Sequence, residues 1–128
     1  MDIAIVGATG NVGRKTLEVL QQKNLNIDNL YLVASPNSAG KQLEFNGKKY
    51  SIENLETYDF SKAKITFFAA GGKISEQYAE KAAKHTTVID NSSYFRMDPD
   101  VPLIVPQVNA KDIQNMKKNI IANPNCST

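Results

Sequence analysis

Hydrophobic residues in this chain gather in short runs that are separated by turn residues and amphipathic segments. The run DIAIV, residues 2–6, is followed at once by a glycine and is typical of a buried strand. From Asn11 to about Lys23, apolar residues recur at helical spacing. The run NLYLVAS, residues 29–35, indicates a second buried strand. The pattern therefore predicts a strand, a helix and a parallel strand joined by a right-handed crossover.

The middle of the chain changes character at Asn46-Gly47, a dipeptide typical of tight β-hairpin turns. The segments QLEF and KKYSIE flank it, and together they predict a small antiparallel hairpin. A buried strand is expected at residues 64–70, followed by a helix over residues 75–85 with Ser75 as its N-cap. We expect three more short strands, at 87–90, 103–106 and 119–123, and a short helix at 110–116.

Strands that alternate with helices predict an α/β fold in which a mostly parallel sheet is covered on both faces, with the hairpin as an antiparallel excursion. The 128 residues are enough for one domain, residues 1–128, with a real core. A net charge of +2 from scattered lysines indicates no basic face for nucleic acid. The apolar runs are too short to span a membrane, and no secretory signal is present. The single cysteine is consistent with a reducing cytoplasm.

The segment GATGNVG carries the first candidate for chemistry. Gly7, Gly10 and Gly13 follow a predicted strand and open a predicted helix, which is the context of a dinucleotide-binding loop. Glycines let backbone amides approach a pyrophosphate, and the helix N-terminus adds free N–H groups and a positive dipole end. A tight strand–helix turn without a ligand is the simpler alternative, and the position of the segment favours binding.

The loop after the second strand bears on the choice of dinucleotide. NAD-binding folds usually place an acidic residue there to bond the ribose 2′-hydroxyl. Here the strand closes with Ser35, and no carboxylate occurs before Glu44. The loop instead offers hydroxyl, amide and ammonium donors, from Asn37, Ser38 and Lys41 among others. This composition favours the 2′-phosphate of NADP, although a polar surface loop would have it too.

Three other features are open to two interpretations each. Gly71-Gly72 follows a predicted strand, where backbone could approach a cofactor or simply turn. Cys126 follows the last strand, where a helix N-terminus could activate its thiol, but a buried, inert cysteine is common for this residue type and is slightly favoured by spacing alone. Arg96 could clamp a phosphate or carboxylate with two hydrogen bonds, or pair with nearby aspartates on the surface. His85, the only histidine, is expected to be solvated.

Several segments in one order resemble the bacterial aspartate-semialdehyde dehydrogenases. They are GATGNVG, SAGK, AAGG, DNSSYFRMDPDVPLIVPQVN and NPNCST, and they span the whole chain. N-acyl-glutamyl-phosphate reductases share the fold and the cysteine chemistry, but there Tyr-Pro usually follows the cysteine, whereas Ser127-Thr128 follows it here. The resemblance implies a Rossmann-like doubly wound fold. It also implies reversible NADP-dependent reductive dephosphorylation of L-aspartyl-4-phosphate to aspartate semialdehyde, on the route to lysine, methionine and threonine.

The resemblance also implies roles for individual residues. Cys126 would be the nucleophile that forms an acyl-thioester, Asn125 would position substrate, and Arg96 would bind phosphate. The adenosine 2′-phosphate region would meet Asn37, Ser38 and Ala39, and Gly71-Gly72 would lie near the nicotinamide. The pyrophosphate would be held by the glycine loop, at Gly7, Thr9, Gly10, Asn11, Val12 and Gly13. No residue is expected to bind a metal.

Two further expectations come with the resemblance. Many members carry arginine where Asn37 stands, so binding of the 2′-phosphate would either be weaker or rely on Lys41 for its positive charge. Family members continue into a second domain with a catalytic histidine and most of a homodimer surface. The chain is therefore expected to be the N-terminal cofactor domain, ending just after the nucleophile and lacking turnover by itself. A dinucleotide-binding module without chemistry is the alternative, and it would have no need of Cys126.

Overall fold

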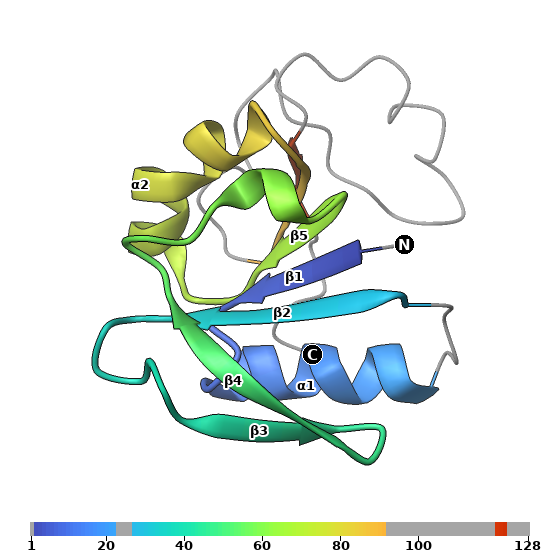
Figure 1. Cartoon of the computed structure of the whole chain (residues 1–128). Helices are drawn as coiled ribbons and strands as arrows, with labels where there is room; N and C mark the ends of the chain where they lie inside the picture. The colour runs from blue at the N-terminus through green and yellow to red at the C-terminus, as the bar shows by residue number, and fades with distance from the viewer. Residues whose placement is uncertain (1, 23–26, 92–119, 123–128) are drawn as a thin grey trace.

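The computed structural model describes residues 2–22, 27–91 and 120–122. The described part is an α/β structure with helices on both sides of a twisted sheet (Figure 1). In chain order its elements are β1 Asp2–Val6, α1 Asn11–Gln22, β2 Asn29–Ala34, β3 Gln42–Phe45, β4 Lys48–Asn54, the 3-10 helix η1 Phe60–Lys62, β5 Ile65–Phe68, α2 Gly72–Ala83, β6 Thr87–Asp90 and β7 Ile120–Ala122.

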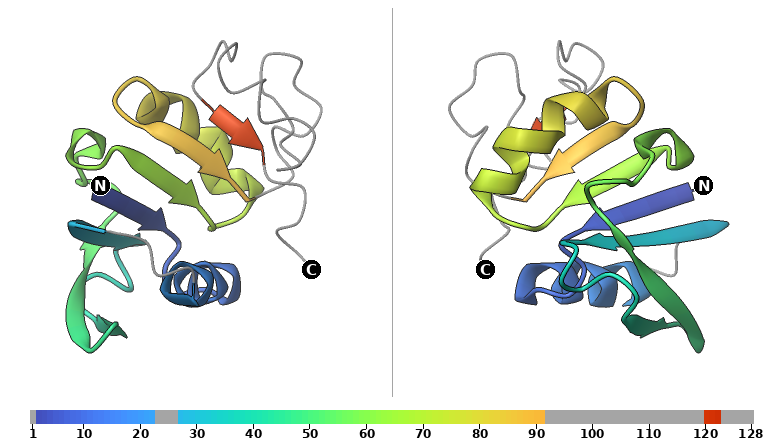
Figure 2. Two further views of the ribbon diagram at one scale, coloured as in Figure 1. Left: turned by 90° about the vertical axis from the view of Figure 1, so that its right-hand side faces the viewer. Right: turned by 60° about the vertical axis from the view of Figure 1, so that its left-hand side comes forward.

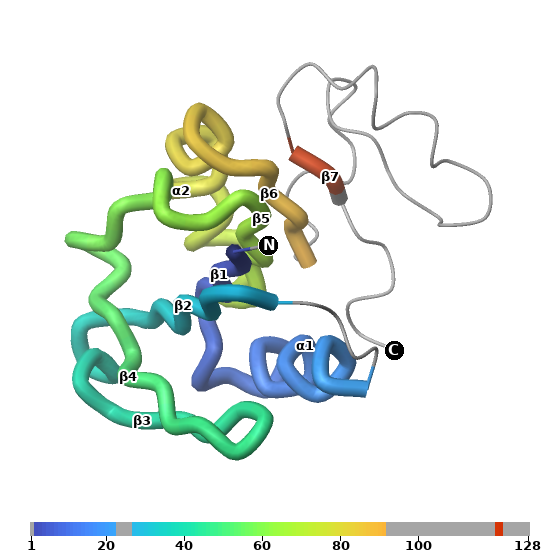
Figure 3. The backbone as a smooth tube through the Cα atoms, turned by 45° about the vertical axis from the view of Figure 1, so that its right-hand side comes forward, coloured from blue at the N-terminus to red at the C-terminus, as the bar shows by residue number. Residues whose placement is uncertain are grey.

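The described strands form one seven-stranded sheet with the order β3-β4-β2-β1-β5-β6-β7. Every pair is parallel except β3 with β4. The chain leaves β1 toward β2 on one side and later returns to β1's other side as β5, so the strand order reverses at β1. Figure 3 shows β6 and β7, which are far apart in sequence, lying side by side at one end of the sheet. The predicted α/β fold with a mostly parallel sheet is confirmed.

The hairpin is confirmed, and it is an integral part of the sheet. Asn46 and Gly47 have φ angles of 55° and 83°, which is the left-handed region that a two-residue hairpin turn requires. β3 and β4 pair through Phe45 and Lys48 next to this turn. β4 then runs on parallel to β2, with Leu32 opposite Ile52. The hairpin thus extends the parallel sheet by two strands.

Each face of the sheet carries its own core, because successive residues of a strand point to opposite faces. On one face α1 buries Leu17 and Leu20 against Ile3, Ile5 and their neighbours on β2 and β4. On the other face α2 and the β4–β5 connection cover the sheet (Figure 2). Burial of each large aliphatic side chain contributes about 1.5–3 kcal/mol to stability. These cores hold α1 and α2 on opposite sides of the same strand ends.

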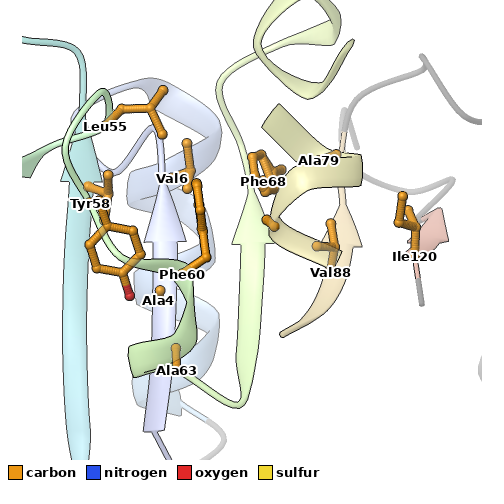
Figure 4. Packing of buried hydrophobic residues seen from close by; sticks show 12 residues of the cluster. Ala4, Val6, Leu55, Tyr58, Phe60, Ala63, Phe68, Ala79, Val88 and Ile120 are labelled. Atoms are coloured by element: carbon orange, nitrogen blue, oxygen red, sulfur yellow. The ribbon is translucent and has the colours of Figure 1, made fainter. Parts of the chain in front are cut away.

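The β4–β5 connection takes the place that a helix would occupy on the second face. Figure 4 shows Tyr58 and Phe60 from this connection lying over β1, beside Val6 and Ala4. The rings of Tyr58 and Phe60 meet edge to face with centroids 5.2 Å apart, and Phe60 stacks on Phe68 at 6.1 Å. No helix was predicted here, and the short η1 is built from these aromatic contacts and from the Asp59 cap.

Among the described residues, the predicted elements are confirmed with small shifts at their ends, except at α2. The predicted N-cap Ser75 is wrong. α2 begins at Gly72 with Gly71 as N-cap, and Ser75 lies inside the helix with its side chain fully buried. The polar side chain that suggested a cap instead bonds to a neighbouring strand. The helix ends at Ala83, two residues before its predicted end at His85, and His85 is exposed as expected.

The strand predicted at 103–106 and the helix predicted at 110–116 lie outside the described residues. Over the part of the chain that the structure describes, no helix has both the length and the apolar character to cross a membrane.

Candidate functional site

A cleft of about 380 Å³ opens at the carboxyl ends of β1, β2 and β5. This is the point where the strand order reverses, and ligands of open α/β sheets bind at such crevices. The segment after β1 forms the floor, and the first turns of α1 and α2 stand on either side. The lining residues are Val6, Gly7, Thr9, Gly10, Asn11, Val12, Ala34, Ser35, Leu55, Ala69, Ala70 and Ile74.

Gly7 allows the loop after β1 to pass close to the end of β5. Its φ angle is +88°, a conformation that L residues with a side chain rarely adopt. An added Cβ would lie 2.8 Å from the backbone carbonyl of Ala69 and from the Cβ of Ala70. The amide of Gly7 also donates to the carbonyl of Val33 at 2.8 Å, which ties the loop to β2. Gly7 is therefore required by the protein's own packing.

Gly13 is required for a different reason. It lies buried in the first turn of α1, and an added Cβ would overlap the carbonyl oxygen of Gly7 and approach the Cα of Ala8 to 2.8 Å. Because Gly13 has no side chain, the first turn of α1 can pack directly against the backbone of the loop after β1. The N-terminal turn of α1 consequently faces the cleft at close range.

Gly10 differs from both. It is exposed, it lines the cleft, and its φ is not positive. An added Cβ would meet only the carbonyl oxygen of Gly7, at an ordinary 3.6 Å. Nothing in the described protein therefore demands a glycine at position 10. A glycine here instead leaves free the volume directly in front of the α1 N-terminus, as the close approach of a ligand would require.

The N-terminus of α1 is suited to an anion. The amide of Gly10 bonds to Gly7, and the first intrahelical bond runs from Arg14 to Gly10, at 3.0 and 2.9 Å. The amides of the first helical residues, at 11–13, precede the point where i→i−4 bonding begins. The first turn contains no acidic residue to occupy them. These amides and the helix dipole can together bind phosphate oxygens.

The loop after β2 is shaped by its own backbone. The amides of Ser38 and Ala39 donate to the carbonyl of Ser35 at 2.9 and 3.2 Å, which folds residues 35–39 into turns. Gly40 and Lys41 then pair with Ile52 on β4, at 2.9 and 2.7 Å. Ser35 lines the cleft, whereas Asn37, Ser38, Ala39 and Lys41 are not among its lining residues. Asn37 and Lys41 are exposed, so their donors are free to meet a ligand that extends from the cleft.

Glu53 is a carboxylate near this edge that the sequence reasoning did not weigh. It stands opposite Val33 in the parallel pair of β2 and β4. Its side chain forms an ion pair with Lys62 at 3.5 Å on the face covered by α2, and it does not line the cleft. The place where an acidic residue would hold a ribose 2′-hydroxyl is thus occupied by Ser35.

The Gly71-Gly72 pair lies at the predicted edge of the sheet but outside the cleft lining. Gly71 has a φ of +92° and caps α2, and an added Cβ there would meet no atom within 4 Å. Apolar residues on either side of this pair line the cleft instead, namely Ala69, Ala70 and Ile74. Together with Leu55 they form an apolar wall that the sequence reasoning missed. Leu55, Ala69 and Ala70 come directly after the carboxyl ends of strands, and this is the signal that could have found them.

Arg96, Asn125 and Cys126 lie outside the described residues. Among the residues that are described, the side chains of His, Cys, Asp and Glu form no group of three or more that could hold a metal ion.

Residues 2–116 match a protein family described as semialdehyde dehydrogenase, NAD binding domain. The chain belongs to this family. Aspartate-semialdehyde dehydrogenase of Aquifex aeolicus is 54% identical over 98% of this chain and 38% of that protein. Aspartate-semialdehyde dehydrogenase 2 of Vibrio cholerae is 50% identical over 99% of this chain and 38% of that protein. The chain thus spans well under half the length of these relatives.

Solved structures agree with the family assignment. Aspartate semialdehyde dehydrogenase II of Vibrio cholerae, complexed with ASA, superposes with a TM-score of 0.91 at 48% identity. That match covers 98% of this chain and 42% of the other. The enzyme of Candida albicans, solved with NADP, has a TM-score of 0.75 at 22% identity, which shows the shared fold alone. The Rossmann-like, doubly wound fold expected from the sequence is confirmed.

Proposed function

We propose that the chain binds a nicotinamide dinucleotide in the cleft, with the pyrophosphate against Thr9–Gly13. The observation that carries this proposal is the contrast among the three glycines. Gly7 and Gly13 are required by internal packing, whereas the absence of a side chain at Gly10 only keeps the cleft open. Membership of a family described as an NAD binding domain supports the same ligand class.

The proposed dinucleotide is NADP in preference to NAD. Ser35 directly follows β2, where an acidic residue would select the ribose 2′-hydroxyl, and the nearby Glu53 forms an ion pair with Lys62. The exposed donors of the following loop, with Lys41 as the cation, would receive the 2′-phosphate. Asn37, Ser38 and Ala39 would surround it. Gly71-Gly72 would lie toward the nicotinamide end.

Calorimetric titration of the chain with NADP and with NAD tests this assignment. Lys41→Met keeps most of the aliphatic stem and removes the charge, so it should weaken NADP binding about threefold to tenfold and leave NAD binding unchanged. Lys64→Met, at another exposed lysine, is the matched control and should change neither. Equal affinity of the unmodified chain for the two dinucleotides would refute the NADP assignment.

The proposed reaction is that of aspartate-semialdehyde dehydrogenase, carried out by the protein to which this dinucleotide-binding domain belongs. Cys126 would attack the acyl carbon of aspartyl phosphate as a thiolate, forming a thioester and expelling phosphate. Arg96 would hold that phosphate with two hydrogen bonds, and Asn125 would position the acyl group. Bound NADPH would supply the hydride that converts the thioester to the aldehyde, and the Cys126 thiolate would leave as the C–S bond breaks. The relatives in Aquifex and Vibrio support this substrate over an N-acyl-glutamyl phosphate.

The phosphate role of Arg96 can be tested on this chain. Arg96→Lys keeps the charge but loses the planar two-pronged geometry, so the affinity for inorganic phosphate should fall about tenfold. Arg14→Lys, at the exposed arginine of α1, is the control for a general effect of replacing arginine. Unchanged phosphate affinity in Arg96→Lys would assign Arg96 to a surface ion pair.

A further inference from the structure

Two adjacent residues at the end of β6 reach in opposite directions, toward the two helices beside the cleft. Asp90 is the last residue of β6 and is fully buried on the face covered by α2. Asn91 follows it, is also buried, and turns to the face covered by α1. The alternation of side chains along an extended chain is the reason for this division.

Asp90 is bonded to the first turn of α2. The hydroxyl of Ser75 donates to Oδ1 of Asp90 at 2.7 Å, and both side chains are fully buried. Ser75 is the residue after Ile74, which lines the cleft. A buried hydrogen bond of this kind is costly to lose, because its polar groups are shielded from water. It holds the wall formed by α2 at a fixed distance from the end of β6.

Asn91 is linked to α1 by a longer hydrogen bond, through the side chain of Thr16. Its Nδ2 donates to the hydroxyl of Thr16 at 3.5 Å, and this hydroxyl donates to the carbonyl of Val12 at 2.8 Å. Val12 lines the cleft on the α1 side. The backbone amide of Asn91 donates to the carbonyl of Phe68 at 2.9 Å, so Asn91 itself is anchored to β5. The first turn of α1 is thereby joined to the centre of the sheet across 75 residues of sequence.

We infer that Asp90 and Asn91 are positioning residues for dinucleotide binding, because together they hold the two helical walls of the cleft at the separation the ligand requires. This inference rests on the proposed function of the cleft. Neither residue lines the cleft, so each acts through another side chain, Asp90 through Ser75 and Asn91 through Thr16. The same pair also explains why a polar Ser75 is buried in the interior of α2.

The inference is tested by cutting each link without touching the cleft. Thr16→Val and Ser75→Ala should each weaken NADP binding about threefold to tenfold, the effect of losing one hydrogen bond that orders a wall. Thr16→Ser keeps the hydroxyl and should bind as the unmodified chain does. Thr66→Val is the matched control: it removes a buried hydroxyl that lies 3.1 Å from the Thr86 hydroxyl and does not line the cleft. Thr66→Val should lower the stability of the fold by about as much as the two link variants do, and it should leave the affinity for NADP unchanged.

Amide hydrogen exchange provides a second readout that needs no ligand. Thr16→Val should speed exchange in the first turns of α1, Ser75→Ala in those of α2, and Thr66→Val in neither. If the unmodified chain binds NADP and both link variants bind it equally well, the inference is wrong. If the unmodified chain binds no dinucleotide, the proposed function is wrong, and hydrogen exchange alone then tests whether Asp90 and Asn91 hold the two helices. Equal changes in exchange in all three variants would show that they do not.

Discussion

The carbonyl oxygen of Gly7 lies where a side chain on Gly13 would have to be, so the loop after β1 and the first turn of α1 are in direct backbone contact. This contact brings the N-terminus of α1 to the cleft. It also makes Gly13 a structural requirement that is independent of any ligand.

Gly13→Ala should therefore destabilise the chain strongly. The new methyl group would overlap backbone atoms that cannot rotate away, and overpacking of this kind costs about 1–3 kcal/mol. We expect a loss at the upper end of that range in the free energy of unfolding, measured by urea denaturation without cofactor. A stability equal to that of the unmodified chain would mean that α1 can shift away from the loop.

Gly10→Ala should leave stability intact but weaken the binding of NADP. Its Cβ would make only ordinary contact with the protein, and its φ is not positive, so stability should be unchanged or rise by up to about 1 kcal/mol. The same methyl group would stand where a pyrophosphate approaches the backbone. We expect NADP affinity to fall about tenfold or more in calorimetry. Undiminished affinity would show that the ligand does not approach Gly10.

Tyr58 offers a test of stability and its pH dependence. Its side chain is only 8% exposed, and among the described residues its hydroxyl has no hydrogen-bond partner. Tyr58→Phe removes an unsatisfied polar group from the core. We expect the free energy of unfolding at neutral pH to be unchanged or to rise by up to about 1 kcal/mol. A clear loss of stability would show that the hydroxyl makes a favourable interaction.

The same substitution should alter alkaline denaturation. Burial, followed by the charge of Glu53, raises the pKa of Tyr58 above its usual value of 10.0. Because the pKa is raised in the folded state, ionisation of Tyr58 does not reduce stability below pH 10.0. As the pH rises above that value the folded chain loses stability, since Tyr58 ionises first in the unfolded chain. Unfolding curves collected through this range should show a steeper loss for the unmodified chain than for Tyr58→Phe. Parallel losses would contradict the assignment.

Asp59 should give stability a pH dependence of the opposite sign, in the acid range. Its Oδ1 accepts from the hydroxyl and the amide of Ser61, at 2.7 and 3.0 Å, and these bonds lower the pKa of Asp59 below its usual 3.8. Because the pKa is lowered in the folded state, Asp59 stabilises the fold at pH values above 3.8. This stabilisation is lost as the pH falls through the pKa of the folded state. Asp59→Asn should therefore be less stable than the unmodified chain near neutral pH, with the difference shrinking as the solution is acidified. A difference that does not depend on pH would contradict this account.

The sequence alone predicted most of the local structure of the described residues and pointed to a dinucleotide as the proposed ligand. The apolar runs at residues 2–6 and 29–34 predicted buried strands, and Asn46-Gly47 predicted the hairpin turn, because each depends on residues close together in the chain. The segment GATGNVG predicted the dinucleotide loop for the same reason. These features need no knowledge of what packs against them.

Only the tertiary structure decided what depends on contacts between distant segments. The order of the strands, with β1 between β2 and β5, could not be read from the sequence. These neighbouring strands in the sheet are distant in the chain, and the sequence is compatible with several ways of pairing them. The three glycines of one motif look alike in sequence, yet Gly7 and Gly13 are needed by packing and Gly10 is not. Serine is a typical helix-capping residue, but Ser75 is buried and its hydroxyl bonds to Asp90 instead. A tertiary partner here overrides the local preference of the residue.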